Sequence, residues 1–121
     1  MSKKILIADD SMLIRRQVTA ALTAAGYVVV EAVDGEDARQ KLTPDLTLIV
    51  CDLNMPRMNG LELLEKLHAD ASMSHVPFVM LTTEARPGIY EKAKMLGAKA
   101  WLIKPFKPDL LLAAVDRLVP R

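Results

Sequence analysis

Extra cysteines, long apolar runs and an excess of charge of one sign are all missing from this chain. Its single cysteine, Cys51, cannot form an internal disulfide, which favours a reducing compartment. No apolar stretch approaches the roughly 18 to 20 residues of a membrane span. The first apolar run, residues 5–8, is also too short for the core of a signal peptide. We therefore expect a cytoplasmic protein with no membrane segment.

The charges of the chain are nearly balanced. The chain has 16 Lys and Arg residues and 15 Asp and Glu residues, which gives a net charge of +1 at pH 7. This balance does not support nucleic-acid binding driven by overall charge, so we expect no direct contact with nucleic acid. The 51% hydrophobic and 26% charged residues are typical of a globular domain. With 121 residues and no linker or shift in composition, the sequence predicts one domain over residues 1–121.

Four short apolar runs each end in a polar side chain. The runs are followed by Asp9-Asp10, Asp52, Thr82-Thr83 and Lys104. Runs rich in Val, Ile and Leu, separated by helix-like stretches, predict buried strands of a parallel sheet. Ligands bind at the carboxyl ends of such strands. If the strands are neighbours, three carboxylates, a hydroxyl and an ammonium meet in a pocket suited to a divalent cation and an anion.

Strand and helix patterns alternate five times along the chain. The expected strands cover residues 5–8, 27–30, 46–51, 78–81 and 101–103, and the expected helices cover residues 11–25, 36–42, 61–67, 87–96 and 108–118. The chain is half the usual size of a (βα)8 barrel, which excludes that fold. Five such units predict an open, doubly wound α/β fold with helices on both faces of a five-stranded parallel sheet. Gly88 costs a helix about 1 kcal/mol relative to Ala, so the fourth helix is expected to fray or start late.

The three carboxylates are the first candidate ligands. Asp9 and Asp10 follow the first strand and Asp52 follows the third. Close carboxylates repel one another unless a cation is bound. Oxygen ligands without His or Cys nearby suit Mg²⁺ better than Zn²⁺. The alternative is that Asp9 or Asp10 merely caps the first helix and that Asp52 begins a loop.

Lys104 and the two threonines are candidates for the anion. Lys104 leaves the last strand directly before Pro105, which restricts the local backbone. Its ammonium suits a phosphoryl or carboxylate oxygen, and Thr82 or Thr83 could donate a hydroxyl to the same group. A solvated lysine at a strand end is the simpler alternative.

These motifs resemble the response-regulator receiver domain, the phosphoacceptor module of two-component signalling. The matching segments follow the family's order and spacing: Asp9-Asp10-Ser11, residues 52–61 (DLNMPRMNGL), residues 81–85 (LTTEA), Gly97-Ala98 and Lys104-Pro105-Phe106. A looser resemblance to the stand-alone chemotaxis subclass rests on length and on Asn54, Thr82-Thr83-Glu84 and Trp101. The resemblance implies a flavodoxin-like (βα)5 fold with strand order 2-1-3-4-5.

The resemblance also implies the metal ligands. Asp10, Asp52 and the backbone carbonyl of Asn54 would hold Mg²⁺, for which Mn²⁺ can substitute. Asp9 would act largely through water.

Roles in phosphoryl transfer and switching follow from the same resemblance. Asp52 would accept the phosphoryl group from a phosphohistidine of a sensor histidine kinase or phosphotransfer domain. Lys104 and Thr82 would contact the phosphoryl oxygens. Thr82 and Trp101 would form the switch, because Trp101 stands where the family carries a rotating aromatic. The domain would then bind a downstream target protein, acting as a monomer in chemotaxis or motility control, and would not be a turnover enzyme on small substrates.

Other functions remain open at this point. A phosphorelay intermediate or the detached receiver of a transcriptional regulator would share the same motifs. A Mg²⁺-dependent phosphatase working through an aspartyl-phosphate is disfavoured, because Asn54 stands where such enzymes need an Asp. A flavin-binding domain is disfavoured because the first loop is acidic where a phosphate would bind.

Overall fold

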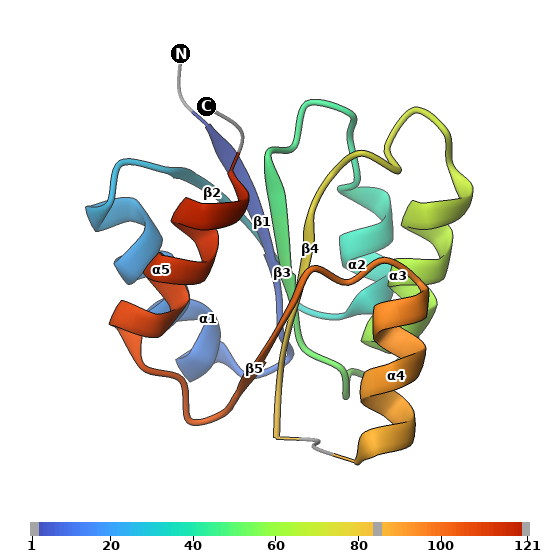
Figure 1. Ribbon diagram of the computed structural model, residues 1–121. Helices are drawn as coiled ribbons and strands as arrows, with labels where there is room; N and C mark the ends of the chain where they lie inside the picture. The colour runs from blue at the N-terminus through green and yellow to red at the C-terminus, as the bar shows by residue number, and fades with distance from the viewer. Residues whose placement is uncertain (1–2, 84–85, 120–121) are drawn as a thin grey trace.

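The computed structural model describes residues 3–83 and 86–119, in which strands and helices alternate along the chain (Figure 1). The elements of these residues are β1 (Lys4–Ala8), α1 (Met12–Ala24), β2 (Val28–Ala32), α2 (Gly35–Gln40), β3 (Leu48–Cys51), α3 (Gly60–Ala69), β4 (Phe78–Thr82), α4 (Pro87–Met95), β5 (Ala100–Ile103) and α5 (Pro108–Leu118). The predicted order of elements is confirmed. Their ends differ from the predicted ones by at most two residues.

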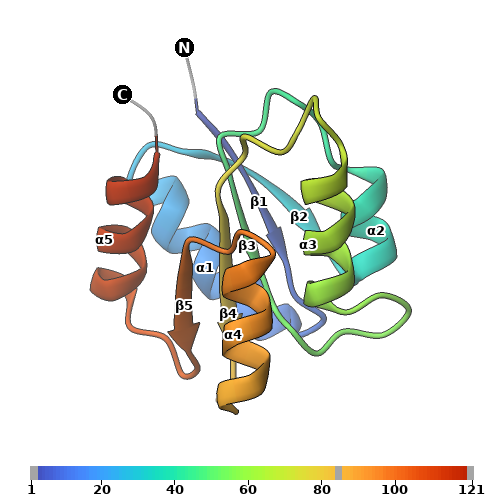
Figure 2. The ribbon, with the colours of Figure 1, turned by 45° about the vertical axis from the view of Figure 1, so that its right-hand side comes forward.

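All strand pairs of the sheet are parallel, and the strand order is β2-β1-β3-β4-β5. Helices α1 and α5 cover one face, and α2, α3 and α4 cover the other (Figures 1 and 2). The doubly wound, flavodoxin-like fold with order 2-1-3-4-5 is therefore confirmed. In this order β1 and β3 lie side by side at the centre, with the register Ala8 to Cys51.

Burial differs between the central and the edge strands. Every residue of β3 and β4 is buried, as is β1 after Lys4, because both faces are covered by helices. For β5 the predicted burial is wrong, and β2, for which no burial was predicted, is likewise partly exposed. Val28 in β2 is 45% exposed and Ile103 in β5 is 48% exposed. Their strands form the edges of the sheet, where no neighbouring strand covers the outer side.

Two apolar clusters fill the space on either side of the sheet. One joins alternate residues of the strands to α3 and α4, and it includes Cys51, Leu64 and Met80. The other joins the remaining strand residues to α1 and α5, and it includes Leu22 and Val115. Burial raises the pKa of the Cys51 thiol well above its usual range, which is typical of an unreactive core thiol.

Local sequence explains most helix ends. The Ser11 side chain accepts a hydrogen bond from the backbone N–H of Ile14 at 3.3 Å and caps α1. After α1, Gly26 has a φ of +97°, which favours glycine. The side chains of Asn59 and Glu62 form a capping box at α3. Helix α4 begins at Pro87 itself, so the late start expected from Gly88 is wrong.

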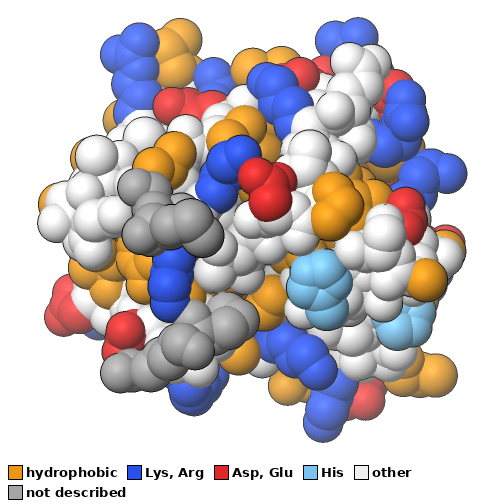
Figure 3. Space-filling model, turned by 90° about the horizontal axis from the view of Figure 1, so that it is seen from above, with side chains coloured by type: hydrophobic (Ala, Val, Ile, Leu, Met, Phe, Trp, Pro, Cys, Tyr) orange, Lys and Arg blue, Asp and Glu red, His pale blue; other side chains and the backbone are white. Residues whose placement is uncertain are grey.

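No helix of residues 3–83 or 86–119 is long and apolar enough to cross a membrane. Figure 3 shows the end of the molecule at which the strands begin. On this face acidic and basic side chains are interspersed with hydrophobic ones.

Candidate functional site

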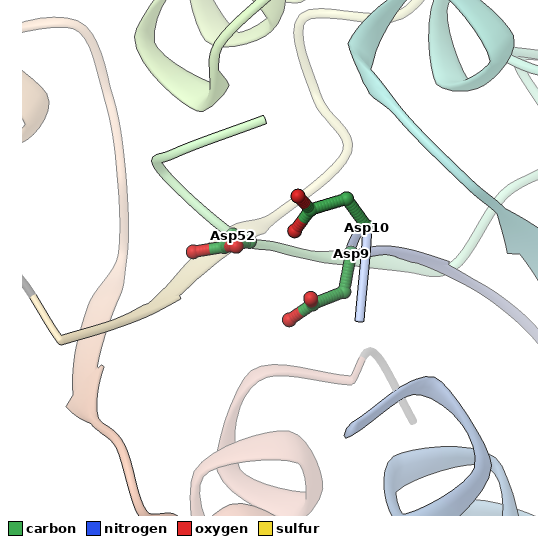
Figure 4. Close-up of side chains that lie close together, drawn as sticks. All are labelled: Asp9, Asp10 and Asp52. Carbon is green, nitrogen blue, oxygen red and sulfur yellow. The ribbon is translucent and has the colours of Figure 1, made fainter. Parts of the chain in front are cut away.

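The carboxyl ends of β1 and β3 bring three carboxylates together. The register of Ala8 with Cys51 places the residues that follow them side by side, and the Asp52 N–H donates to the Ala8 carbonyl at 2.8 Å. Carboxylate oxygens of Asp9, Asp10 and Asp52 all lie within 4.8 Å of one another. Figure 4 shows the three side chains projecting to the same side of the strand ends. The predicted convergence is confirmed.

Asp9 is the most firmly placed of the three. Its side chain is completely buried, and its Oδ1 accepts a hydrogen bond from the backbone N–H of Ser11 at 2.9 Å. Its own N–H donates to the Ala32 carbonyl at 3.2 Å, and its carbonyl accepts from Nη1 of Arg15 at 2.7 Å. Side chain and backbone of Asp9 are thus both bonded to neighbouring elements.

Lys104 reaches two of the carboxylates. Its Nζ lies 2.7 Å from Oδ2 of Asp9 and 3.3 Å from Oδ2 of Asp52. The side chain is only 13% exposed, which rules out the alternative of a solvated lysine. Burial lowers the pKa of Lys104, but the hydrogen bond to Asp9 and the charges of Asp52 and Asp9 outweigh it and raise the pKa overall. The ammonium therefore stays charged at neutral pH.

Asp52 carries an electrostatic cost. It is 5% exposed, and burial together with the charge of Asp9 raises its pKa, although the Lys104 ammonium partly opposes this. One ammonium faces three carboxylates, which leaves an excess of negative charge if all are ionised. A second cation would remove that excess.

The residues fit a magnesium ion. All the candidate ligands are oxygens, one of them on the exposed side chain of Asp10, where it is open to a hydrated ion. Asn54 lies in the loop after β3, and its N–H donates to Oδ1 of Asp52 at 3.4 Å. This contact places the backbone of Asn54 beside the Asp52 carboxylate. The donor set suits a hard cation that keeps several waters.

The two threonines are placed differently. Thr82 is the last residue of β4 and is completely buried, whereas Thr83 is exposed. The carbonyl of Thr82 accepts a hydrogen bond from the Lys104 N–H at 2.9 Å, so β4 and β5 end together beside the site. The position of Thr82 at the end of β4 suits the predicted hydroxyl donor, and which of the two hydroxyls contacts the anion stays a prediction. Glu84 and Ala85 of the same motif lie outside the described residues.

Trp101 lies in β5, which β4 separates from the strand that leads to Asp52. It pairs in register with Met80, is half-buried and packs against the cluster on the side of α3 and α4. Its ring meets Tyr90 of α4 edge to face, with centroids 5.6 Å apart and an angle of 78°. The sequence reasoning missed this contact because Tyr90 and Trp101 share no motif.

The sequence reasoning also assigned no role to Arg15. The side chain is 12% exposed, and its Nε lies 3.4 Å from Oε1 of Glu31 in β2. Nothing in the sequence distinguishes it from the adjacent Arg16, whose side chain is exposed. Only the turn of α1 decides which of the two faces the end of β1.

Comparison with known proteins agrees with the fold. The model of the family described as "Response regulator receiver domain" matches residues 5–116. The chain belongs to the response-regulator receiver family, whose members are signalling modules and bind Mg²⁺ at an acidic pocket.

Among its relatives is the chemotaxis protein CheY1 of Helicobacter pylori, 37% identical over 111 residues, covering 89% of this chain and 90% of the relative. The structure of chemotaxis protein CheY4 of Vibrio cholerae, crystallized at low pH, has a TM-score of 0.89 and 38% identity. This match covers 98% of this chain and all of the other.

A third similar structure is the receiver domain of a sensor histidine kinase from Pseudomonas aeruginosa, at 26% identity and a TM-score of 0.87. The match covers 98% of this chain and 97% of the other. In that structure a magnesium ion is coordinated in the active-site cleft.

Proposed function

We propose that this chain is a stand-alone receiver that accepts a phosphoryl group on Asp52 and signals in chemotaxis or motility control. One observation carries the proposal: the Asp52 carboxylate is buried beside two further carboxylates and within 3.3 Å of the Lys104 ammonium. The names of the chemotaxis relatives favour this pathway over a phosphorelay or a transcriptional regulator. Residues 1–121 would form one receiver domain, acting as a monomer in the cytoplasm.

The chemistry is transfer of one phosphoryl group from nitrogen to oxygen. A carboxylate oxygen of Asp52 attacks the phosphorus of a phosphohistidine on a histidine kinase or phosphotransfer domain. The P–O bond forms as the P–N bond breaks, and the imidazole leaves with the bonding electrons. The charge that spreads over the equatorial oxygens must be neutralised, which is the main task of the protein in such transfers.

Lys104 is placed for that task. In the free protein its ammonium is shared between Asp9 and Asp52. Once Asp52 carries a phosphoryl group, the ammonium can contact a phosphoryl oxygen while its bond to Asp9 keeps it in position. The Thr82 hydroxyl, at the end of β4, would contact a second oxygen.

Asp10, Asp52 and the carbonyl of Asn54 would hold Mg²⁺, with Asp9 acting through water and Mn²⁺ able to substitute. When bound, the ion neutralises charge on the carboxylates and on the transferring group. The excess of negative charge around Asp52 supports this assignment.

The switch would run from Thr82 to Trp101. Drawing the Thr82 hydroxyl toward the phosphoryl group would change the packing behind β4, where Trp101 and Tyr90 meet. Beside them a shallow pocket is lined by these two rings, Lys94 and Lys99. This surface suits a target segment that carries both apolar and acidic side chains.

The proposal is tested by incubation with Mg²⁺ and acetyl phosphate, followed by intact mass and Trp101 fluorescence in the same sample. Wild type is expected to gain one phosphoryl group, and its fluorescence is expected to change. Asp52→Asn should do neither, because an amide cannot form the acyl phosphate. Equal labelling of both proteins would refute the assignment of Asp52. Labelling of wild type without a change in fluorescence would refute the switch alone.

A further inference from the structure

The orientation of the Asp10 carboxylate is not explained by contacts of its own side chain with the described residues. The carboxylate is exposed and makes no hydrogen bond or ion pair with any residue that the structure describes, in contrast to the buried and bonded carboxylate of Asp9. Its position within 4.8 Å of the other two carboxylates must therefore come from the backbone that carries it. The orientation of the peptide between Asp9 and Asp10 is the decisive feature.

Arg15 bonds to that peptide. Its Nη1 donates to the Asp9 carbonyl at 2.7 Å, at the point where β1 leaves the sheet. The guanidinium belongs to a side chain only 12% exposed, so water competes little for the bond. On its other side, Nε lies 3.4 Å from Oε1 of Glu31, which is 41% exposed. The guanidinium thus links α1 and β2 to the peptide that precedes Asp10.

We infer that Arg15 is a positioning residue for the metal site, acting through the Asp9 carbonyl to direct the Asp10 carboxylate toward Asp52. The inference rests on the proposed function, in which Asp10 and Asp52 hold Mg²⁺. Outer partners that orient metal ligands commonly change metal affinity by 10- to 100-fold when they are removed. Arg15 fits this role through a backbone group, where most such partners bond a ligand side chain.

The direction in which Mg²⁺ affinity changes when Arg15 is replaced distinguishes a positioning role from an effect of its charge. Arg15 carries a positive charge near a cation site, so its removal by electrostatics alone would strengthen Mg²⁺ binding. Loss of positioning would weaken it. Arg16→Gln provides the matched control, because it removes the same charge from the next position of α1, where the side chain is exposed.

The experiment is an amide chemical-shift titration with MgCl₂ of the full chain, without a phosphodonor. Arg15→Gln is expected to raise the Mg²⁺ Kd about tenfold, whereas Arg16→Gln should leave it unchanged or lower it. Arg15→Lys, which keeps one donor, should fall between wild type and Arg15→Gln. Glu31→Gln should cost stability as an ion-pair loss but change the Kd less than Arg15→Gln does.

Two results would overturn the inference in different ways. If wild type saturates with Mg²⁺ and Arg15→Gln binds as tightly as Arg16→Gln, the inference alone fails. If wild type shows no saturable shift, the proposed metal site fails and the inference fails with it. The dispersion of the amide spectrum reports whether each variant is folded, and Arg15→Lys serves as the second variant if Arg15→Gln is not.

Discussion

Asp52 shows how one residue can serve function at a cost in stability. Its carboxylate is buried next to Asp9, and burial together with the charge of Asp9 raises its pKa. A carboxyl with a raised pKa binds its proton more tightly in the folded than in the unfolded protein. Ionising it therefore destabilises the fold, and this cost grows as the pH rises from the unfolded pKa near 3.8 through the folded pKa.

Replacing Asp52 by Asn is expected to stabilise the protein at pH 7 without Mg²⁺. The amide keeps the shape and the contact with the Asn54 N–H but removes the buried charge. A gain on the order of 1 kcal/mol would raise Tm by about 4 °C in a domain of this size. Thermal unfolding in EDTA measures it, and the gain should disappear below pH 3.8, where Asp52 is protonated in both states.

Asp70→Asn is the control of opposite sign. Hydrogen bonds from Ser72 lower the pKa of Asp70, so its ionised form is favoured by folding. Neutralising it should lower Tm slightly at pH 7. If Asp52→Asn also lowers Tm, the electrostatic cost assigned to Asp52 is wrong.

At the scale of elements, the loop after β3 is held by the loop before α2. A Cβ added to Gly35, the first residue of α2, would lie 1.8 Å from the Met58 carbonyl oxygen, so the loop after β3 approaches the start of α2 at a distance that only glycine allows. Nearby, Nε of Arg57, which has a φ of +68°, lies 3.0 Å from Oδ2 of the buried Asp34. The loop that carries Asn54 is therefore positioned by a different βα unit.

Two glycines in the first turns of helices should respond oppositely to alanine. Gly35→Ala is expected to destabilise by about 2 kcal/mol, since overpacking against backbone forces the loops apart. Gly88→Ala in α4 meets nothing within 4 Å and should stabilise by about 0.5 kcal/mol. Urea unfolding of both variants measures the free energies. A neutral Gly35→Ala would show that the two loops can separate at no cost.

The whole molecule couples its stability to the site through the sheet. The carboxylates directly follow β1 and β3, whose residues join both apolar clusters, so unfolding disperses the three ligands. A cation that binds only the folded state must then stabilise it. The three carboxylates also repel one another when they are ionised, and a bound cation relieves this repulsion. The effect of the cation on stability should therefore be measurable as a change in Tm.

Mg²⁺ is expected to raise the free energy of unfolding by about 1.4 kcal/mol at a concentration ten times its Kd. Thermal unfolding with MgCl₂, compared with KCl at equal ionic strength, measures this and corrects for screening. Asp52→Asn should gain less, since it lacks one ligand charge. An equal rise in Tm with KCl would show that the ion acts by screening and not by binding at the carboxylates.

Much of this protein was predictable from local patterns in its sequence. Apolar runs and turn residues determined the alternation of strands and helices, because hydrophobic periodicity and caps such as Ser11 act over a few residues. The placement of Asp9, Asp52 and Lys104 at one edge followed, since the carboxyl ends of parallel strands share an edge.

Contacts between distant segments were decided only by the tertiary structure. The positions of β2 and β5 at the edges exposed residues of both strands, among them Ile103, whose apolar run was predicted as buried. The rotation of α1 about its axis directs Arg15 toward the end of β1 and leaves Arg16 exposed. The packing of α4 on β5 places Tyr90 against Trp101. Such contacts depend on the angles and distances between packed elements, which a local stretch of sequence does not determine.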